Sequence, residues 1–459
     1  MRVAYITAGA ANMICGSCLK DNALVSALRC QGRDCLLIPT YTPPRTDEPD
    51  VSLRQVFFSG LSVYLEQKIP WLRHMPGWLE RWLSSPTLLR WISRFAVGTR
   101  AEELGELTIS MLRGPEGYQA YEIDRLASWL QRAYRPDLVC LSNILLSGMV
   151  PVLQDRLGCA VTVELQGDDI FLDHLPAVYK QSAIEQIQRN AENIDAYIVP
   201  CQYYADYMAQ YLGLPRERMH VVYPGINLST FDRARNEVAL ISNNALTDAR
   251  GRDYIVGYLA RICPEKGLHV LVEAVANLVS RGLPVRLEVA GYLGAQDRRY
   301  FEVQRNRAAA QGWSNRFHYW GEVDYLSKVR FLLELDVLSV PTVYREPKGL
   351  YVLEAWAAGV PVVQPQHGSF PELIERSGGG VCVEPNSPRA LADALVQLLQ
   401  QEQQRWELGR RGRQAVESFF HSQRMAEETW QVWARVLHSR HTKPVPMGVS
   451  TELPTGRAL

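Results

Sequence analysis

Short, almost continuously apolar segments recur along the chain, and each is followed by a small loop and an amphipathic stretch. In the first half of the sequence these segments lie at residues 3–7, 35–39, 138–141, 161–165 and 197–200. Strands that are apolar at every position and alternate with helices indicate a parallel sheet covered on both faces. The first half therefore predicts a doubly wound α/β domain.

The same pattern restarts in the second half after a polar interval. Pro224 and Gly225 are followed by a polar run at residues 242–248, which is typical of a connection between domains. Further apolar segments then lie at residues 254–259, 285–290, 336–340 and 360–363. A chain of 459 residues suits two domains of about 200 residues each. We therefore expect two Rossmann-like, doubly wound parallel-sheet domains, whose strand carboxyl ends face an interdomain cleft that binds ligands.

These intervals set the expected domain boundaries. Residues 1–224 form the N-terminal domain, with a helical insertion at about residues 66–100, and residues 225–415 form the C-terminal domain. Residues 416–440 keep a helical pattern, and we expect this helix to return to the N-terminal domain. Residues 441–459 hold Pro, Gly and Thr with little apolar content, which is typical of a disordered tail.

Charge and cysteine usage exclude several classes of protein. The 49 basic and 49 acidic residues cancel, which argues against bulk attraction to nucleic acid. The nine cysteines are an odd number and most lie alone in apolar stretches, which favours a reducing compartment. The N-terminus lacks the basic, apolar and small-residue segments that follow one another in a signal peptide, and no apolar run reaches the length of a membrane span. We expect a cytoplasmic protein without a nucleic-acid partner.

The segment at residues 341–363 contains the most informative acidic residues. Glu346 lies in a loop after a predicted strand, and a helix is expected to start at about Gly349. Glu354 then lies about one and a half turns into that helix, so both carboxylates can face the same cleft. The first amides of the helix, around Gly349 and Leu350, have no partners within it and can bind an anion.

Two segments together resemble the retaining GT-B glycosyltransferase family, which includes sucrose synthase-like and bacterial mannosyltransferase-like enzymes. The first holds Glu346 and Glu354, since the family signature is two glutamates separated by seven residues before a Gly-Val-Pro strand entry. The second reads GYLARICPEKG and carries Arg261 and Lys266 around a turn. Weaker matches are a glycine loop at residues 8–17, a hinge-like VVYPGIN at 221–227 and HGSFPELI at 367–374.

The resemblance implies roles for the matching residues. Arg261 and Lys266 bind the donor diphosphate in such enzymes, and two fixed cations can offset the charge that grows on a departing phosphate. Glu346 accepts from hydroxyls of the transferred sugar and Glu354 from the donor ribose. The implied catalytic set is Glu346, Arg261 and Lys266. The other implied donor-binding positions are Gly16, Gly349 and Leu350.

The resemblance also implies the reaction. A hexose moves from a UDP-, GDP- or ADP-sugar, with retention of configuration, to an acceptor that is a glycan, a lipid-linked molecule or a small molecule. Enzymes of this family use no bound metal, and no cofactor is expected. The N-terminal domain binds the acceptor and the C-terminal domain the donor. A non-catalytic nucleotide-sugar binding protein and a nucleotide-sugar epimerase of the same fold are the alternatives.

The sequence departs from the family pattern at two positions. Many relatives carry a histidine where this chain has Gln166 in VELQGDD, and glutamine cannot take a proton. Asp168 then becomes a candidate for orienting the acceptor, together with Gln166. Lys348 stands where an aromatic residue is common, and either adds positive charge near the diphosphate or points to solvent.

Residues 66–100 interrupt the strand–helix pattern with tryptophans and arginines at helical spacing. A basic, Trp-rich amphipathic helix suits peripheral contact with the inner face of a membrane, where lipid-linked acceptors are found. The same stripe is equally typical of a lid packed on the N-terminal domain. Both interpretations stay open at the level of the sequence.

Overall fold

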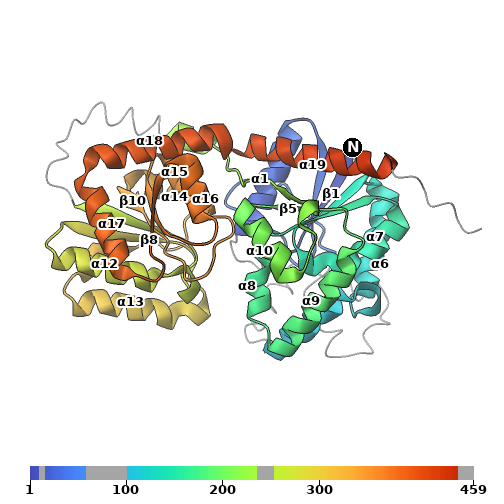
Figure 1. Ribbon diagram of the computed structural model, residues 1–459, viewed down its shortest axis with the longest axis horizontal. Helices are drawn as coiled ribbons and strands as arrows, with labels where there is room; N and C mark the ends of the chain where they lie inside the picture. Colours follow the sequence, from blue (N-terminus) through green and yellow to red (C-terminus); the bar gives the residue numbers. More distant parts are fainter. Residues whose placement is uncertain (10–15, 58–100, 235–252, 443–459) are drawn as a thin grey trace, which may run out of the picture.

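The computed structural model describes residues 1–9, 16–57, 101–234 and 253–442, which form two α/β domains side by side (Figure 1). This arrangement confirms the predicted pair of doubly wound domains. The insertion predicted at 66–100, the polar run at 242–248 and residues 443–459 of the tail predicted at 441–459 lie outside the described residues. Residues 441 and 442 are helical. Of the helices in the described ranges, none is both long and apolar enough to cross a membrane.

The N-terminal domain is a six-stranded parallel sheet in the order β2-β1-β3-β4-β5-β6. Its strands are β1 (Arg2–Thr7), β2 (Asp34–Pro39), β3 (Leu138–Leu141), β4 (Ala160–Glu164), β5 (Ala196–Val199) and β6 (Met219–Val221). Its α-helices are α1 (Gly16–Cys30), α5 (Ala101–Leu112), α6 (Ala120–Trp129), α7 (Val150–Leu157), α8 (Asp168–Asp173), α9 (Ala177–Ala191) and α10 (Gln202–Leu212). The strand order reverses between β1 and β3, so the loops after these two strands diverge and leave a crevice.

The C-terminal domain repeats this design with the order β12-β11-β10-β7-β8-β9. Its strands are β7 (Tyr254–Leu259), β8 (Val285–Ala290), β9 (Phe317–Tyr319), β10 (Val337–Leu338), β11 (Val362–Pro365) and β12 (Gly380–Val383). Its α-helices are α12 (Leu268–Ser280), α13 (Arg298–Ala310), α14 (Tyr325–Glu334), α15 (Leu350–Ala358), α16 (Phe370–Ser377), α17 (Pro388–Gln400) and α18 (Glu402–Phe419). Here the order reverses between β7 and β10.

The chain passes between the domains at two places that hydrogen bond to each other. Ile226 N donates to Phe420 O at 3.0 Å, and Ser422 N donates to Ile226 O at 2.9 Å. Gly225 lies here because an added Cβ would come within 2.4 Å of His421 O. The two crossings therefore form one paired hinge.

The last helix, α19 (Ser422–Thr442), lies along the N-terminal domain (Figure 1). Its Trp433 is fully buried and its ring centroid lies 6.5 Å from that of Tyr5 in β1. Helix α19 thus completes the apolar core on one face of the N-terminal sheet.

Candidate functional site

The loops that follow β7 and β10 lie at the point where the C-terminal strand order reverses, and they carry the predicted basic and acidic residues. Gly267 ends the loop after β7 with φ +74°, and an added Cβ would lie 1.8 Å from Pro341 O. Only glycine allows this approach. The contact brings the adjacent Lys266 against the loop that follows β10.

Lys266 and Glu346 form a buried ion pair. Lys266 Nζ lies 2.6 Å from Glu346 Oε2, and the Glu346 side chain is 6% exposed. Tyr344 donates its hydroxyl to the same oxygen at 2.5 Å. Burial would raise the pKa of Glu346, but Lys266, Tyr344 and Lys348 lower it to about 2. Glu346 is therefore a fixed carboxylate across the physiological pH range.

The second carboxylate oxygen of Glu346 accepts from the backbone of its own loop. The amides of Lys348 and Gly349 lie 3.3 Å and 3.4 Å from Oε1. The predicted glycine-containing loop at 367–374 hydrogen bonds to the Glu346 backbone, since Ser369 N donates to Glu346 O at 2.8 Å. These contacts fix the orientation of the carboxylate.

Helix α15 begins beside this carboxylate. Gly349 takes the N-cap position with φ +62°, Gly359 ends the helix with φ +81°, and no side chain caps the first turn. The Gly349 amide donates to Glu346, and the amides that follow it are available to an anion. Leu350 faces the other domain, since a Cβ added to Gly16 would lie 3.4 Å from its Cδ1. The structure therefore brings Gly16 next to Leu350, the residue that follows Gly349.

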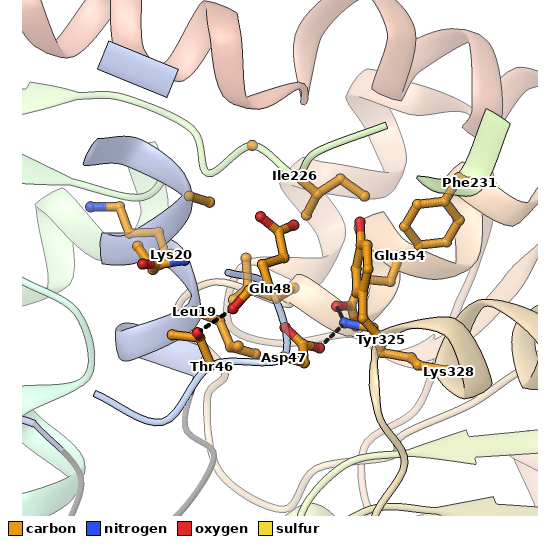
Figure 2. Close-up of a pocket in the computed structure, with 14 residues that line it drawn as sticks. Leu19, Lys20, Thr46, Asp47, Glu48, Ile226, Phe231, Tyr325, Lys328 and Glu354 are labelled. Carbon is orange, nitrogen blue, oxygen red and sulfur yellow. Dashed lines mark hydrogen bonds and ion pairs between the residues drawn. The ribbon is translucent and has the colours of Figure 1, made fainter. Parts of the chain in front are cut away.

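Glu354 belongs to a second cluster, which spans the two domains (Figure 2). Lys328 of α14 places its Nζ 2.5 Å from Glu354 Oε1 and 2.5 Å from Oδ2 of Asp47, which belongs to the N-terminal domain. Burial would lower the pKa of Lys328, but the two carboxylates raise it. Burial raises the pKa of Glu354 against the charge of Lys328. A small cavity of about 30 Å³ adjoins this cluster between the domains.

Arg261 differs from its predicted partner Lys266. Arg261 is exposed and forms no ion pair within the described part of the chain; burial would lower the pKa of its guanidinium, but Cys263, Glu265 and Asp297 raise it. It follows β7 at the crevice, so it offers a positive charge at the open side of the site.

Gln166 and Asp168 occupy the N-terminal side of the interdomain contact, after β4. Gln166 donates from Nε2 to Asp21 Oδ1 at 3.0 Å and to Ser142 O at 2.9 Å. Asp168 accepts from the amides of Ile144 and Gln166 at 3.1 Å and 2.9 Å. Burial raises the pKa of Asp168 to about 6, although these amides oppose the shift. Both side chains thus hold the loop together.

Lys348 joins the two halves of the site. Its Nζ lies 2.7 Å from Ser17 Oγ in α1 and 3.4 Å from Gln166 Oε1. The residue is 7% exposed. Of the two interpretations open from the sequence, the structure excludes a side chain pointing to solvent. Lys348 instead links the start of α15 to the N-terminal domain.

Three site residues were not found from the sequence. Lys328 and Asp47 are separated by 281 positions and pair across the domain boundary. The only local signal was a lysine on the buried stripe of α14, three residues before the buried Phe331. Tyr344, two positions before Glu346, donates to it and also lies under Lys266, whose Nζ is 5.0 Å from the ring centroid.

No group of three or more His, Cys, Asp or Glu side chains suited to holding a metal occurs within the described residues. One part of the site lies where the C-terminal domain contacts the N-terminal domain, and it contains Lys266, Glu346, Lys348, Gly349 and Leu350 beside Gly16 and Gln166. The Glu354 cluster lies further along the same face between the domains. The arrangement offers cations and helix amides to an anion, and carboxylates to hydroxyl groups.

Two family models match consecutive parts of the chain. Residues 23–225 match the "Glycosyl transferase 4-like domain", and residues 245–415 match "Glycosyl transferases group 1". Together the matches cover both domains.

Curated relatives match about half of the chain. The D-inositol 3-phosphate glycosyltransferase of Corynebacterium efficiens is 27% identical over 225 residues, which are 48% of this chain and 52% of that protein. The capsular polysaccharide biosynthesis glycosyltransferase CapM of Staphylococcus aureus is 27% identical over 209 residues, 44% of this chain and 51% of that protein. The chain thus spans about half the length of these relatives.

Solved structures with the same fold cover nearly the whole chain. Sucrose-phosphate synthase from Thermosynechococcus elongatus has a TM-score of 0.68 at 18% identity, over 96% of this chain and 100% of that one. The catalytic domain of starch synthase IV from Arabidopsis thaliana, bound to ADP and acarbose, has a TM-score of 0.63 at 13% identity, over 95% and 99%. Anabaena HepE in complex with UDP has a TM-score of 0.61 at 14% identity, over 95% and 100%. This likeness establishes the GT-B architecture.

Proposed function

Because the chain belongs to the group 1 glycosyltransferases, we propose that it transfers a hexose from a nucleoside-diphosphate sugar to an acceptor, with retention of configuration. The observation that carries this proposal is the buried Lys266–Glu346 pair beside the uncapped start of α15. A cation, helix amides and a fixed carboxylate converge there on one small volume.

The departing diphosphate is the group that these cations suit. As the bond to the sugar breaks, negative charge grows on the phosphate oxygen, and preorganised positive groups lower the barrier to that step. Glu346 and Tyr344 hold the Lys266 ammonium in place. Arg261 lies at the solvent-exposed side of the site, and the amides after Gly349 direct the positive end of the α15 dipole toward the site. These groups can stabilise the leaving group without a metal.

The two glutamates suit hydroxyl groups rather than a covalent role. Glu346 is engaged through both oxygens by Lys266 and backbone amides, which favours a positioning function toward sugar hydroxyls. Glu354 would accept from the donor ribose. Gln166 cannot take a proton, so we propose that the donor phosphate itself receives the proton of an acceptor attacking from the same face.

The site divides between the domains in a way that supports separate substrates. The residues proposed for the donor lie on the C-terminal domain, apart from Gly16. Gln166 and Asp168 lie on the N-terminal domain, where we propose that the acceptor binds. Solved proteins of this fold are bound to UDP or ADP, which supports a nucleotide donor here.

The proposal is tested by calorimetry with UDP, GDP and ADP, followed by product analysis with the sugar donor of the nucleotide that binds. We expect one nucleotide to bind, and proton NMR of the product to report the donor anomeric configuration. Glu354→Gln should weaken binding about tenfold or more, because it removes a charged hydrogen-bond acceptor. Glu375→Gln, on an exposed side chain of α16, is the matched control.

Other outcomes would favour the alternatives. Binding without transfer to any acceptor and without donor hydrolysis would indicate a non-catalytic binding protein. A change in the donor sugar with the nucleotide still attached would indicate an epimerase. Inversion of the anomeric configuration would contradict the proposed stereochemistry.

A further inference from the structure

A segment of the N-terminal domain reaches across to the C-terminal domain beside Glu354. We call residues 45–48, which follow β2, the strap. Arg45 forms an ion pair with Glu322 at 3.1 Å, and Asp47 forms the 2.5 Å pair with Lys328. The side chains of Asp47 and Lys328 are each 7% exposed. Figure 2 shows Asp47 pointing from the strap toward Lys328 and Glu354.

The residues after the strap are tied to the N-terminal domain instead. Asn22 of α1 donates from Nδ2 to Pro49 O at 3.0 Å and accepts from Val51 N at 3.0 Å. Arg29 of the same helix donates to Val51 O at 2.7 Å. Residues 45–48 can therefore move away from the C-terminal domain while the hydrogen bonds of Pro49 and Val51 to α1 stay intact.

The seated strap leaves too little room for a nucleoside. The cavity lined by Asp47, Glu48, Lys328 and Glu354 measures about 30 Å³. Pockets for small ligands measure about 300–1,000 Å³, roughly ten times as much or more. Its wall also includes apolar side chains such as Leu350 and Phe231 and polar ones such as Asn22, Thr46 and Tyr325. A ribose could reach Glu354 here only if the strap moved.

The charges in this cluster do not balance. Asp47, Glu48 and Glu354 line the cavity with two cations: Lys328, whose ammonium pairs with Asp47 and Glu354, and Lys20, which pairs with Glu164. Burial and the nearby Asp47 raise the pKa of Glu48, and Lys328, Asn227 and Tyr325 oppose this shift only in part. The repulsion between these neighbouring acidic groups opposes the attraction between Asp47 and Lys328.

We propose that the strap is a latch that donor binding displaces. It is seated while the nucleoside subsite is vacant, and it detaches from Lys328 and Glu322 when the nucleoside moiety of a nucleoside diphosphate enters beside Glu354. This inference rests on the proposed function, because it takes Glu354 as the partner of the donor ribose. Donor binding and strap seating then exclude each other.

Mutual exclusion has a measurable consequence for affinity. If only the unlatched fraction of molecules binds donor, the apparent dissociation constant equals the intrinsic value divided by that fraction. Asp47→Asn removes the strap carboxylate that pairs with Lys328, and it leaves Glu48 in place and Lys328 paired with Glu354. The variant should therefore fold normally and bind nucleotide several-fold more tightly than the wild type. Asp50→Asn, on an exposed side chain beyond the strap, is the matched control.

The test combines trypsin cleavage after Arg45 with calorimetry of UDP, GDP and ADP on the full chain. We expect Asp47→Asn to be cleaved several-fold faster than the wild type and Asp50→Asn to match the wild type. Adding the nucleotide that binds should accelerate cleavage of the wild type. In calorimetry, Asp47→Asn should show the lower dissociation constant.

Three results would overturn the inference, and they separate it from the proposed function. Slower cleavage with nucleotide would mean that the strap closes over the ligand instead of leaving it. Faster cleavage of Asp47→Asn with an unchanged dissociation constant would mean that the strap does not obstruct the donor, while the donor site itself stands. Absence of nucleotide binding by wild type and variant alike would remove the proposed function and the latch together.

Discussion

Among single residues, Glu346 is the one whose surroundings are most completely specified. Its carboxylate is buried, accepts from Lys266, Tyr344 and two backbone amides, and has a pKa lowered to about 2. A group whose pKa is depressed contributes stability above its unfolded value near 4.5, and that stability is lost as the pH falls through about 2. Near neutral pH the Lys266–Glu346 ion pair is thus fully charged, and we propose that its Lys266 ammonium contacts the donor diphosphate.

Replacing Lys266 tests the role of that cation in turnover. Lys266→Met should lower kcat by about 100-fold or more, because one preorganised donor to a developing negative charge has effects of that size. Lys180→Met, at a surface lysine paired with Asp173, should keep wild-type turnover. Undiminished kcat in Lys266→Met would remove the leaving-group assignment.

The Lys266 variant needs a check on folding, because it leaves Glu346 buried without its cation. The double variant Lys266→Met/Glu346→Gln removes both charges and should recover most of the lost thermal stability without recovering turnover. Recovery of turnover in the double variant would mean that the single variant was merely unfolded.

Asp168 gives a pH dependence of the opposite sign. Burial raises its pKa from 3.8 to about 6, so the folded protein binds a proton more tightly than the unfolded chain between about pH 4 and 6. Wild-type stability relative to Asp168→Asn should therefore fall by about 3 kcal/mol as the pH rises through this window. Urea unfolding of both proteins at pH 4 and pH 7.5 measures the difference. A wild-type advantage that grows with pH would contradict the assignment.

At the scale of elements, glycines at positive φ place the loops of the site. Gly349 starts α15, Gly359 ends it, and Gly267 lets the loop after β7 touch Pro341. These positions could be predicted in part, since a glycine on either side of a short helix is a strong boundary signal. The close approach of Gly267 to Pro341 could not, because it depends on two loops 74 positions apart in the chain.

Gly267→Ala tests this close approach. The variant suffers both an unfavourable φ and a collision of Cβ with Pro341 O at 1.8 Å. Gly282→Ala has a similar φ of +79° but no atom within 4 Å of the added Cβ. Its loss of stability therefore measures the cost of the unfavourable φ alone. Thermal unfolding should show a clearly larger loss for Gly267→Ala, together with a loss of turnover. Equal losses in the two variants would mean that the collision is relieved.

The strands that the sequence predicted are those that are buried on both faces. All four residues of β3 and all four of β5 are buried, and their apolar runs marked them. The edge strands β6, β9 and β12 were not predicted. Two of them have three residues and include a histidine, His220 or His318, and three of the four residues of β12 are only half-buried. Short edge strands that face solvent carry too few apolar positions to stand out.

At the scale of the whole molecule, the domains are joined by the hinge, by α19 and by contacts across their facing surfaces. One such contact places Glu372 of α16 at the start of α10 in the other domain. Its carboxylate accepts from the amides of Gln202 and Tyr203 at 2.8 Å and 2.9 Å, and from the Tyr223 hydroxyl at 2.5 Å. A negative charge at a helix start is stabilising, so this contact favours the arrangement of domains seen here.

Neutralising Glu372 should loosen that arrangement. Glu372→Gln is expected to increase the radius of gyration measured by small-angle X-ray scattering, while Glu375→Gln on the same helix should leave it unchanged. If the two variants scatter identically, the contact does not hold the domains together.

Contacts between the domains could not be predicted from the sequence. Each member, such as Asp47 or Lys328, has an ordinary local context, and only the fold brings the pair together. The resemblance located Glu346, Lys266 and Gly349 because their spacing within each loop is fixed. It could not show that Glu354 shares Lys328 with the N-terminal domain.

The central claim is that Lys266, Arg261 and the start of α15 hold the diphosphate of the donor. A crystal structure of the wild-type protein with the nucleoside diphosphate that binds in calorimetry tests it most directly. We predict phosphate oxygens in contact with the Lys266 ammonium and the amides that follow Gly349, with the ribose hydroxyls on Glu354. A diphosphate bound away from these groups, with the Lys266–Glu346 pair untouched, would contradict the account.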